Sequence, residues 1–168
     1  MLLVKNMTNK MDSQPITILG IGNTLFSDEG VAIHLLPILE KALRDYENIE
    51  IIEGSTDGMR LLGPVEDAEN LIIIDAINAG EPGGTIIKLE GDKIPAYFGI
   101  KMSIHQLGFQ EVLMAAKMRE CYPKRIVMLG MQPTSLELGV ELTEINREQL
   151  GNLASLVVGQ INDWRNLS

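Results

Sequence analysis

Short apolar runs alternate with amphipathic stretches along most of the chain. The runs predict five strands, at residues 16–21, 49–53, 71–76, 85–89 and 124–129. The run at 71–74 is unbroken Leu and Ile, which is typical of a central parallel strand covered on both faces. The fourth strand follows the third too closely for a helical crossover, so we predict that it runs antiparallel at an edge of the sheet.

Helical spacing of apolar positions predicts helices at residues 28–44, 57–63, 106–120 and 143–164. Pro37 lies inside the first helix and should kink it. Thr143 is suited to cap the last helix. Residues 90–104 and 130–143 lack a clear period and are predicted to be loops. Strands alternating with helices indicate an α/β fold, in which helices cover both faces of a mostly parallel sheet.

Length and charge narrow the function classes. We expect residues 1–14 to be a flexible tail and residues 15–168 to form a single domain. Fourteen basic against 23 acidic residues give a net charge of −9, which argues against nucleic-acid binding. No run approaches the ~18 apolar residues of a membrane span. The lone cysteine, Cys121, agrees with a reducing compartment, so we expect a cytoplasmic protein.

Three separate segments each bring one side chain that can bind a metal to the expected ligand edge of the sheet. Glu29 follows the first strand, Asp75 ends the third, and His105 opens a helix after a long loop. Ligands of such sheets bind at the carboxyl ends of the strands. Two carboxylates and an imidazole are enough to bind one divalent cation. The pattern therefore favours a metal-dependent activity.

Each of these residues also has an ordinary structural explanation. Asp75 is suited to cap a helix or stabilise a turn, since a buried carboxylate is costly unless paired. Glu29 complements the positive end of its helix, although Asp28 is the better dipole partner and the two can exchange roles. His105, at a helix start, is kept neutral as a ligand must be, but surface histidines are common. His34 cannot share a helical face with Glu29, so we assign it to packing or solvent.

A glycine pattern after the first strand offers a different reading. Gly20 and Gly22 resemble half of a dinucleotide fingerprint, and Glu53 mimics its ribose-binding acid. Leu25 stands where the third glycine belongs. We therefore interpret the two glycines as a tight turn that brings Glu29 to the edge of the strand. A nucleotide-binding α/β protein stays an alternative.

Four segments together resemble the hydrogenase maturation endopeptidases, which process the large subunit of nickel–iron hydrogenases. They are residues 19–30 (LGIGNTLFSDEG), 74–76 (IDA), 103–108 (SIHQLG) and 129–137 (LGMQPTSLE). The resemblance extends from about residue 16 to residue 164. It implies a three-layer α/β/α sandwich with a mostly parallel, five-stranded sheet.

The resemblance also implies the chemistry of the site. Glu29, Asp75 and His105 would bind nickel that the substrate supplies, and zinc or cadmium would substitute for it. The substrate would be a nickel-loaded hydrogenase large-subunit precursor, from which a metal-dependent endopeptidase removes a C-terminal extension. A nickel-sensing maturation chaperone that does not cut would use the same residues. We expect a monomer.

Two positions depart from the family pattern. Many relatives have glycine where this chain has Ala32. The loop after the second strand usually reads Asp-Gly-Gly-Thr, whereas here it reads Glu53-Gly54-Ser55-Thr56. Glu53, Gly54 and Ser55 are therefore candidates for a substrate loop that selects the hydrogenase isoform.

Overall fold

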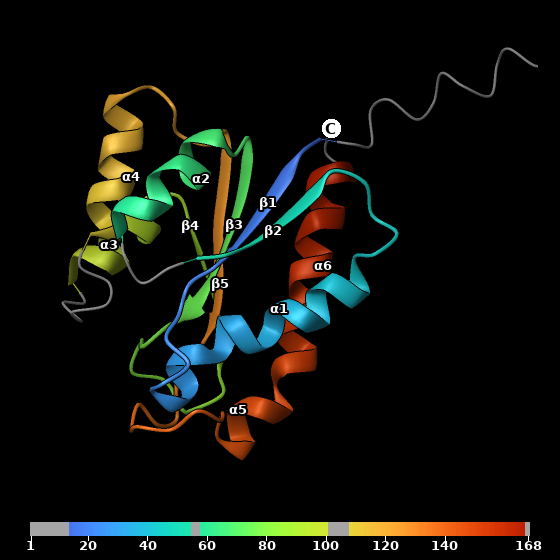
Figure 1. The fold of residues 1–168 in the computed structure, drawn as a ribbon, viewed down its shortest axis with the longest axis vertical. Helices are drawn as coiled ribbons and strands as arrows, with labels where there is room; N and C mark the ends of the chain where they lie inside the picture. Colours follow the sequence, from blue (N-terminus) through green and yellow to red (C-terminus); the bar gives the residue numbers. More distant parts are fainter. Residues whose placement is uncertain (1–13, 55–57, 101–107, 167–168) are drawn as a thin grey trace, which may run out of the picture.

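One mixed sheet forms the centre of the molecule (Figure 1). The computed structural model describes residues 14–54, 58–100 and 108–166. In this part, five strands are arranged in the order β2-β1-β3-β5-β4. Their bounds are β1 Ile16–Gly20, β2 Ile49–Glu53, β3 Asn70–Ala76, β4 Ile86–Glu90 and β5 Arg125–Met131. Only the β4–β5 pair is antiparallel among them, which confirms the predicted antiparallel edge strand.

Helices cover both faces of the sheet, because successive side chains of a strand point to opposite sides. Ile16, Ile18 and Ile72 pack into one core cluster with α1 (Val31–Ala42) and α6 (Leu150–Asn166). Leu19 and Ile73 pack into a second cluster with helices on the opposite face. These helices are α2 (Leu62–Asp67), α3 (Lys93–Ile100) and α4 (Phe109–Met118). The predicted three-layer α/β/α sandwich is confirmed (Figure 1).

The predicted loop at 90–104 was wrong for its central part, which is helix α3. Ile94 and Phe98 are four residues apart, so they share one helical face, and both are buried in the second cluster. Pro95 is compatible with this helix, because it lies in the first turn where backbone N–H groups have no partner within the helix. Burial against α4 thus decides the conformation of a segment whose own pattern is weak.

The remaining helices differ from the prediction at their ends. The first begins as a 3₁₀ turn, η1 (Ser27–Gly30), before α1, which contains Pro37. The short helix expected at 57–63 is η2 (Gly58–Leu61) followed by α2. The last helix is divided into α5 (Glu144–Glu148) and α6, because the Gln149 N–H bonds the Asn146 carbonyl and tightens the final turn of α5. Thr143 caps α5 as predicted.

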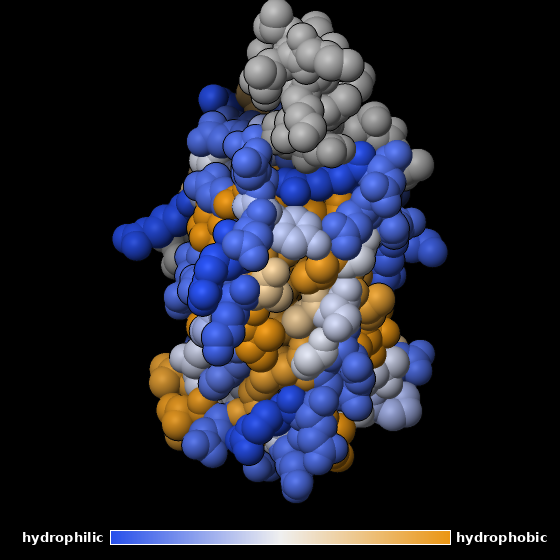
Figure 2. All heavy atoms as spheres, turned by 90° about the vertical axis from the view of Figure 1, so that its right-hand side faces the viewer, coloured by the Kyte–Doolittle hydropathy of each residue, from blue (hydrophilic) through white to orange (hydrophobic). Residues whose placement is uncertain are grey.

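Two exposed glutamates interrupt the apolar side chains of the edge strand β2. Glu50 lies between two half-buried isoleucines and Glu53 follows a third, and such charges discourage pairing with another strand. On the side of the molecule shown in Figure 2, apolar side chains gather in a central furrow bordered by hydrophilic ones.

Within the described ranges, every helix is too short or too polar to cross a membrane.

The strand order reverses its direction between β1 and β3. The chain passes from β1 through α1 to β2 on one side, and β3 then lies on the other side of β1. In open α/β sheets, ligands bind in the crevice outside the carboxyl ends of the two strands that flank such a switch point. The crevice between β1 and β3 is therefore where a functional site is expected.

Candidate active site

Glu29 and Asp75 both lie at this crevice. The ends of the two strands are adjacent, because Gly20 pairs with Ile74 and the Ile21 N–H bonds the Ile74 carbonyl at 2.8 Å. Asp75 is the next residue of β3, and η1, which carries Glu29, packs against β3. The third sequence-predicted ligand, His105, lies outside the described residues. The structure thus brings two carboxylates to one edge of the sheet.

Asp75 lies next to the last residue of β3, and a backbone hydrogen bond holds its carboxylate in place. Its side chain is fully buried, and its Oδ1 accepts a hydrogen bond from the Ala76 N–H at 2.8 Å. Its cross-strand neighbour on β5 is Gly130, where a Cβ atom would lie only 2.1 Å from the Asp75 carbonyl oxygen. A glycine is therefore required opposite Asp75, a constraint that the sequence alone did not reveal.

The turn after β1 packs directly against η1. A Cβ atom on Gly22 would lie 2.4 Å from the Glu29 carbonyl oxygen, so only glycine fits there. Gly20 faces the side chain of Leu36, which a Cβ atom would approach to 3.1 Å. Both glycines have packing roles, in agreement with their interpretation as a tight turn beside Glu29.

Asp28, next to Glu29, has a structural role that the sequence did not identify. Its fully buried carboxylate accepts hydrogen bonds from the backbone N–H groups of Thr134 (2.9 Å), Ser135 (3.0 Å) and Thr143 (2.8 Å). The Thr143 hydroxyl donates a further bond at 2.9 Å. Asp28 therefore fastens the loop at residues 132–143 onto η1. These partners lie 106 to 115 residues away, so no local pattern signals them.

A buried polar network continues from this loop toward the end of β3. The Thr134 hydroxyl donates to the Asn146 Oδ1, and the Asn146 Nδ2 donates to the Gln132 carbonyl at 3.1 Å. The Gln132 Oε1 in turn accepts the Ala79 N–H at 2.7 Å. The loops that follow β3 and β5 are thereby connected around the crevice.

Tyr97 is a second residue near the site that sequence reasoning missed. Its hydroxyl donates to the Ala76 carbonyl at 3.2 Å and accepts the Asn78 N–H at 3.3 Å. The N–H of the same residue, Ala76, donates to the Asp75 carboxylate. The sequence contained one signal for this position of Tyr97. Ile94 and Phe98 are four residues apart, and a helix that buries both of them against the sheet places Tyr97 next to Phe98 at the same surface.

The substrate-loop candidates lie at the end of β2. Glu53 is exposed, whereas Gly54 is buried and its N–H donates to the Gly20 carbonyl at 2.7 Å. A Cβ atom on Gly54 would lie 2.9 Å from that same oxygen. Gly54 thus closes β2 onto β1, and Ser55 lies outside the described residues.

Among the residues that the structure describes, other polar positions do not form a competing metal site. In the part of the chain that the structure describes, no three His, Cys, Asp or Glu side chains lie close enough to bind a metal. His34 is half-buried and lines a hollow of about 340 Å³ beside Leu142 and Arg147, as expected of a packing residue.

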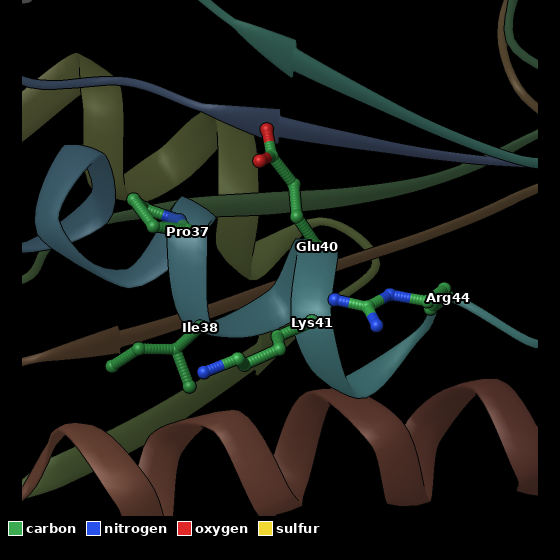
Figure 3. A pocket seen from close by; sticks show the side chains of 5 residues that line it. All are labelled: Pro37, Ile38, Glu40, Lys41 and Arg44. Carbon is green, nitrogen blue, oxygen red and sulfur yellow. The ribbon is translucent and has the colours of Figure 1, made fainter.

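A hollow of about 650 Å³ lies farther along α1, lined by Pro37, Ile38, Glu40, Lys41 and Arg44. Figure 3 shows the side chain of Glu40 pointing away from those of Lys41 and Arg44. Binding sites for small molecules need polar groups that converge. The crevice between β1 and β3 therefore stays the candidate active site.

Comparisons with known proteins identify the family to which this chain is similar. A family model described as hydrogenase maturation protease matches residues 33–160. The hydrogenase expression/formation protein HupD of Thiocapsa roseopersicina is 40% identical, over 76% of this chain and 58% of the relative. This chain thus spans about three fifths of that relative's length. The hydrogenase 2 maturation protease of Escherichia coli is also 40% identical, over 76% of this chain and 79% of the relative.

The fold has a close counterpart among solved structures. The hydrogenase maturating endopeptidase HybD from E. coli superposes with a TM-score of 0.81 at 32% identity, covering 89% of this chain and 93% of that chain. The family model, the sequence relatives and this structure agree with one another. This chain therefore belongs to the hydrogenase maturation protease family.

Proposed function

We propose that this protein is an endopeptidase that removes the C-terminal extension of a nickel-loaded hydrogenase large-subunit precursor. The substrate's nickel is the recognition element, and Glu29, Asp75 and His105 bind it. One observation carries the proposal: in a chain of this protease family, Asp75, whose carboxylate is fully buried, is the next-to-last residue of β3 at the switch point beside η1, which contains Glu29.

The donor set suits such an ion. Carboxylate oxygens and an imidazole nitrogen are ligands for first-row divalent metals such as nickel, and zinc accepts the same donors. The Ala76 N–H bonds one oxygen of Asp75, and the Tyr97 hydroxyl bonds the Ala76 carbonyl, which belongs to the next peptide group. Groups that orient a ligand in this way raise its affinity for metal. The pairing of a rigid Asp75 with a half-exposed Glu29 supports a site that receives its metal from a partner.

Recognition through nickel explains selectivity for the loaded precursor. An empty precursor offers no cation to Glu29 and Asp75, so it lacks the contact through which the loaded precursor would bind. When bound, a divalent cation polarises a neighbouring carbonyl or lowers the pKa of a water. The protein's own contribution is to hold the substrate's metal centre at the crevice and so fix the position of the scissile segment.

The experiment compares nickel-loaded and nickel-free precursor by intact-protein mass spectrometry. We expect the wild-type protein to release a short C-terminal peptide from the loaded precursor alone. Glu29→Ala, Asp75→Asn and His105→Ala should each abolish release while leaving the urea unfolding curve nearly unchanged. Glu50→Gln, on the exposed face of β2, is the matched control and should process normally.

Full processing by His105→Ala would contradict the assigned ligand set. Equal processing of the nickel-free precursor would contradict recognition through nickel. An intact precursor that forms a nickel-dependent complex with the wild-type protein would instead indicate a maturation chaperone that does not cut.

A further inference from the structure

Two loops beside the crevice carry exposed apolar side chains. Leu25, just before η1, is 54% exposed. Leu136, Leu138 and Val140, in the loop after β5, are 46%, 81% and 66% exposed. We name these four residues the apolar rim. Large apolar side chains gathered on one surface are typical of a site for another macromolecule.

The backbone beneath the apolar rim is well ordered by hydrogen bonds. The Gly139 N–H donates to the Leu25 carbonyl at 2.9 Å, and the Ser27 N–H donates to the Gly139 carbonyl at 2.7 Å. The Ser27 hydroxyl donates to the Glu137 carbonyl at 2.7 Å. Phe26 and Gly139 form a parallel β-bridge. Because these bonds already join the two loops, little ordering entropy is lost when a partner binds.

The apolar rim is also fixed relative to the candidate active site. Ser27, Asp28 and Glu29 are consecutive in η1. Ser27 bonds the rim loop, Asp28 bonds Thr134 and Thr143 of the same loop, and Glu29 follows at the crevice. A chain that binds along the apolar rim is therefore held next to the residues proposed to bind nickel.

The charges around the apolar rim indicate what kind of partner fits. Exposed acids alternate with its apolar residues, with Glu137 between Leu136 and Leu138, and Glu141 after Val140. The nearest ion pair is loose: the Glu141 carboxylate lies 3.7 Å from the Arg147 guanidinium, and both side chains are exposed. Such a surface is complementary to a segment that combines apolar residues with Lys or Arg.

We propose that the apolar rim is the docking surface for the protein substrate. A segment of the precursor that carries apolar side chains and Lys or Arg binds along Leu25, Leu136, Leu138 and Val140, while its scissile region reaches the crevice. This inference rests on the proposed function and adds to it the surface that selects the substrate.

The test measures both cleavage kinetics and affinity for the nickel-loaded precursor. The double variant Leu138→Ser with Val140→Ser should raise KM and Kd by about tenfold or more and leave kcat nearly unchanged. Its matched control is Leu156→Ser with Met118→Ser, at positions 48% and 82% exposed on α6 and α4, which should behave as wild type. Glu137→Lys should weaken binding most at low salt.

The outcomes separate docking from the proposed function. Wild-type protein that cleaves, together with rim variants of unchanged KM and Kd, would overturn docking and leave the function standing. Wild-type protein that binds through the rim without cleaving would support docking and overturn the function. Neither binding nor cleavage would overturn both. A wild-type dimer that the rim variants convert to monomers in sedimentation would assign the rim to a second copy of this chain and overturn the proposal.

Discussion

The loop at residues 132–143 and the crevice between β1 and β3 meet at η1, yet different contacts shape them. On the loop side, the buried Asp28 carboxylate binds donors that lie 106 to 115 residues away. On the crevice side, the Oδ1 of Asp75 binds its own neighbour, Ala76, and Glu29 is only half-buried. Two adjacent acids of one motif thus differ in their surroundings: Asp28 holds the loop at residues 132–143 onto η1, whereas Glu29 is the acid that we propose binds nickel.

Asp28→Ala tests this difference with the largest expected loss of stability. Removing the carboxylate leaves three backbone N–H groups without their acceptor, whereas the Thr143 hydroxyl can still donate to the Asn146 Oδ1 at 3.2 Å. Because each unsatisfied donor costs on the order of 1–3 kcal/mol, we expect the free energy of unfolding to fall by at least about 3 kcal/mol. Urea denaturation followed by circular dichroism measures the change.

Glu29→Ala is the control for that measurement. It removes the neighbouring acid of η1, and the free energy of unfolding should change by less than about 1 kcal/mol. Asp28→Asn should fall between the two variants, since an amide keeps one acceptor oxygen but turns its NH₂ toward N–H donors. If Asp28→Ala and Glu29→Ala lowered the free energy of unfolding equally, the distinction between the loop side of η1 and its crevice side would be contradicted.

Gly130→Ala, opposite Asp75 at the crevice, should give the next largest loss of stability. The new methyl group would lie 2.1 Å from the Asp75 carbonyl oxygen and 2.6 Å from the Ile77 side chain, so β3 and β5 must separate. Overpacking of this kind destabilises by about 2–3 kcal/mol, and it should also lower processing because Asp75 moves. Urea unfolding and the precursor assay measure the two effects.

The matched glycine is Gly159, in the middle of α6, where a Cβ atom meets no other atom within 4 Å. Gly159→Ala should raise stability by about 0.5–1 kcal/mol, because alanine loses less conformational freedom in a helix. A neutral Gly130→Ala variant would show that the contacts opposite Asp75 are not decisive, and a destabilised Gly159→Ala variant would show that Gly159 is not a valid control for it.

Where the residue pattern was strong, the sequence alone predicted the fold well. Runs of isoleucine and leucine located β1 and β3, and the short connection to β4 predicted its antiparallel direction correctly. The pairing of β1 with β3 follows from that topology, so Glu29 and Asp75 were expected at one edge. Helix α3 was missed because Pro95 and Gly99 obscure its period, and burial of Ile94 and Phe98 against α4 decides its conformation.

The sequence alone could not show that Asp28 and Glu29 of η1 have different surroundings. Asp28 and Glu29 are equivalent in local sequence, and both suit the first turn of a helix. They differ only because the loop after β5 folds back and presents the N–H groups of Thr134 and Thr143 to one of them. Tyr97 was hidden for a related reason, since its contact with the Ala76 carbonyl depends on where α3 packs.

Tyr97→Phe tests the contacts near Asp75 at the crevice, with a smaller expected loss of stability. It removes the hydroxyl that bonds the Ala76 carbonyl and the Asn78 N–H but keeps the ring, which packs against Phe98. We expect a loss of about 1 kcal/mol in the free energy of unfolding. Processing should slow severalfold, because Ala76, whose N–H bonds the Asp75 carboxylate, is then held less firmly.

Tyr122→Phe is the matched control for the Tyr97 variant. Tyr122 is a half-buried tyrosine with Lys117 over its ring, a contact that phenylalanine retains. It should process the precursor at the wild-type rate. A Tyr97→Phe variant that loses stability but processes normally would mean that Tyr97 supports the fold without positioning Asp75.

The smallest effect is expected at an exposed ion pair on β4, remote from both regions. The Lys88 Nζ lies 2.8 Å from the Glu90 Oε1, and this hydrogen bond, followed by the attraction of the Lys88 charge, lowers the pKa of Glu90. A carboxyl whose pKa is lowered on folding stabilises the protein above its unfolded pKa, and this contribution disappears as the pH falls through the folded pKa. Because both side chains are exposed, Lys88→Met should reduce stability at neutral pH by less than about 0.5 kcal/mol, with no difference in acid or in high salt.

If Lys88→Met instead matched Tyr97→Phe in urea unfolding at neutral pH, surface charge would contribute as much as the contacts around the crevice. The contrast between specific buried contacts and the rest of the surface would then fail.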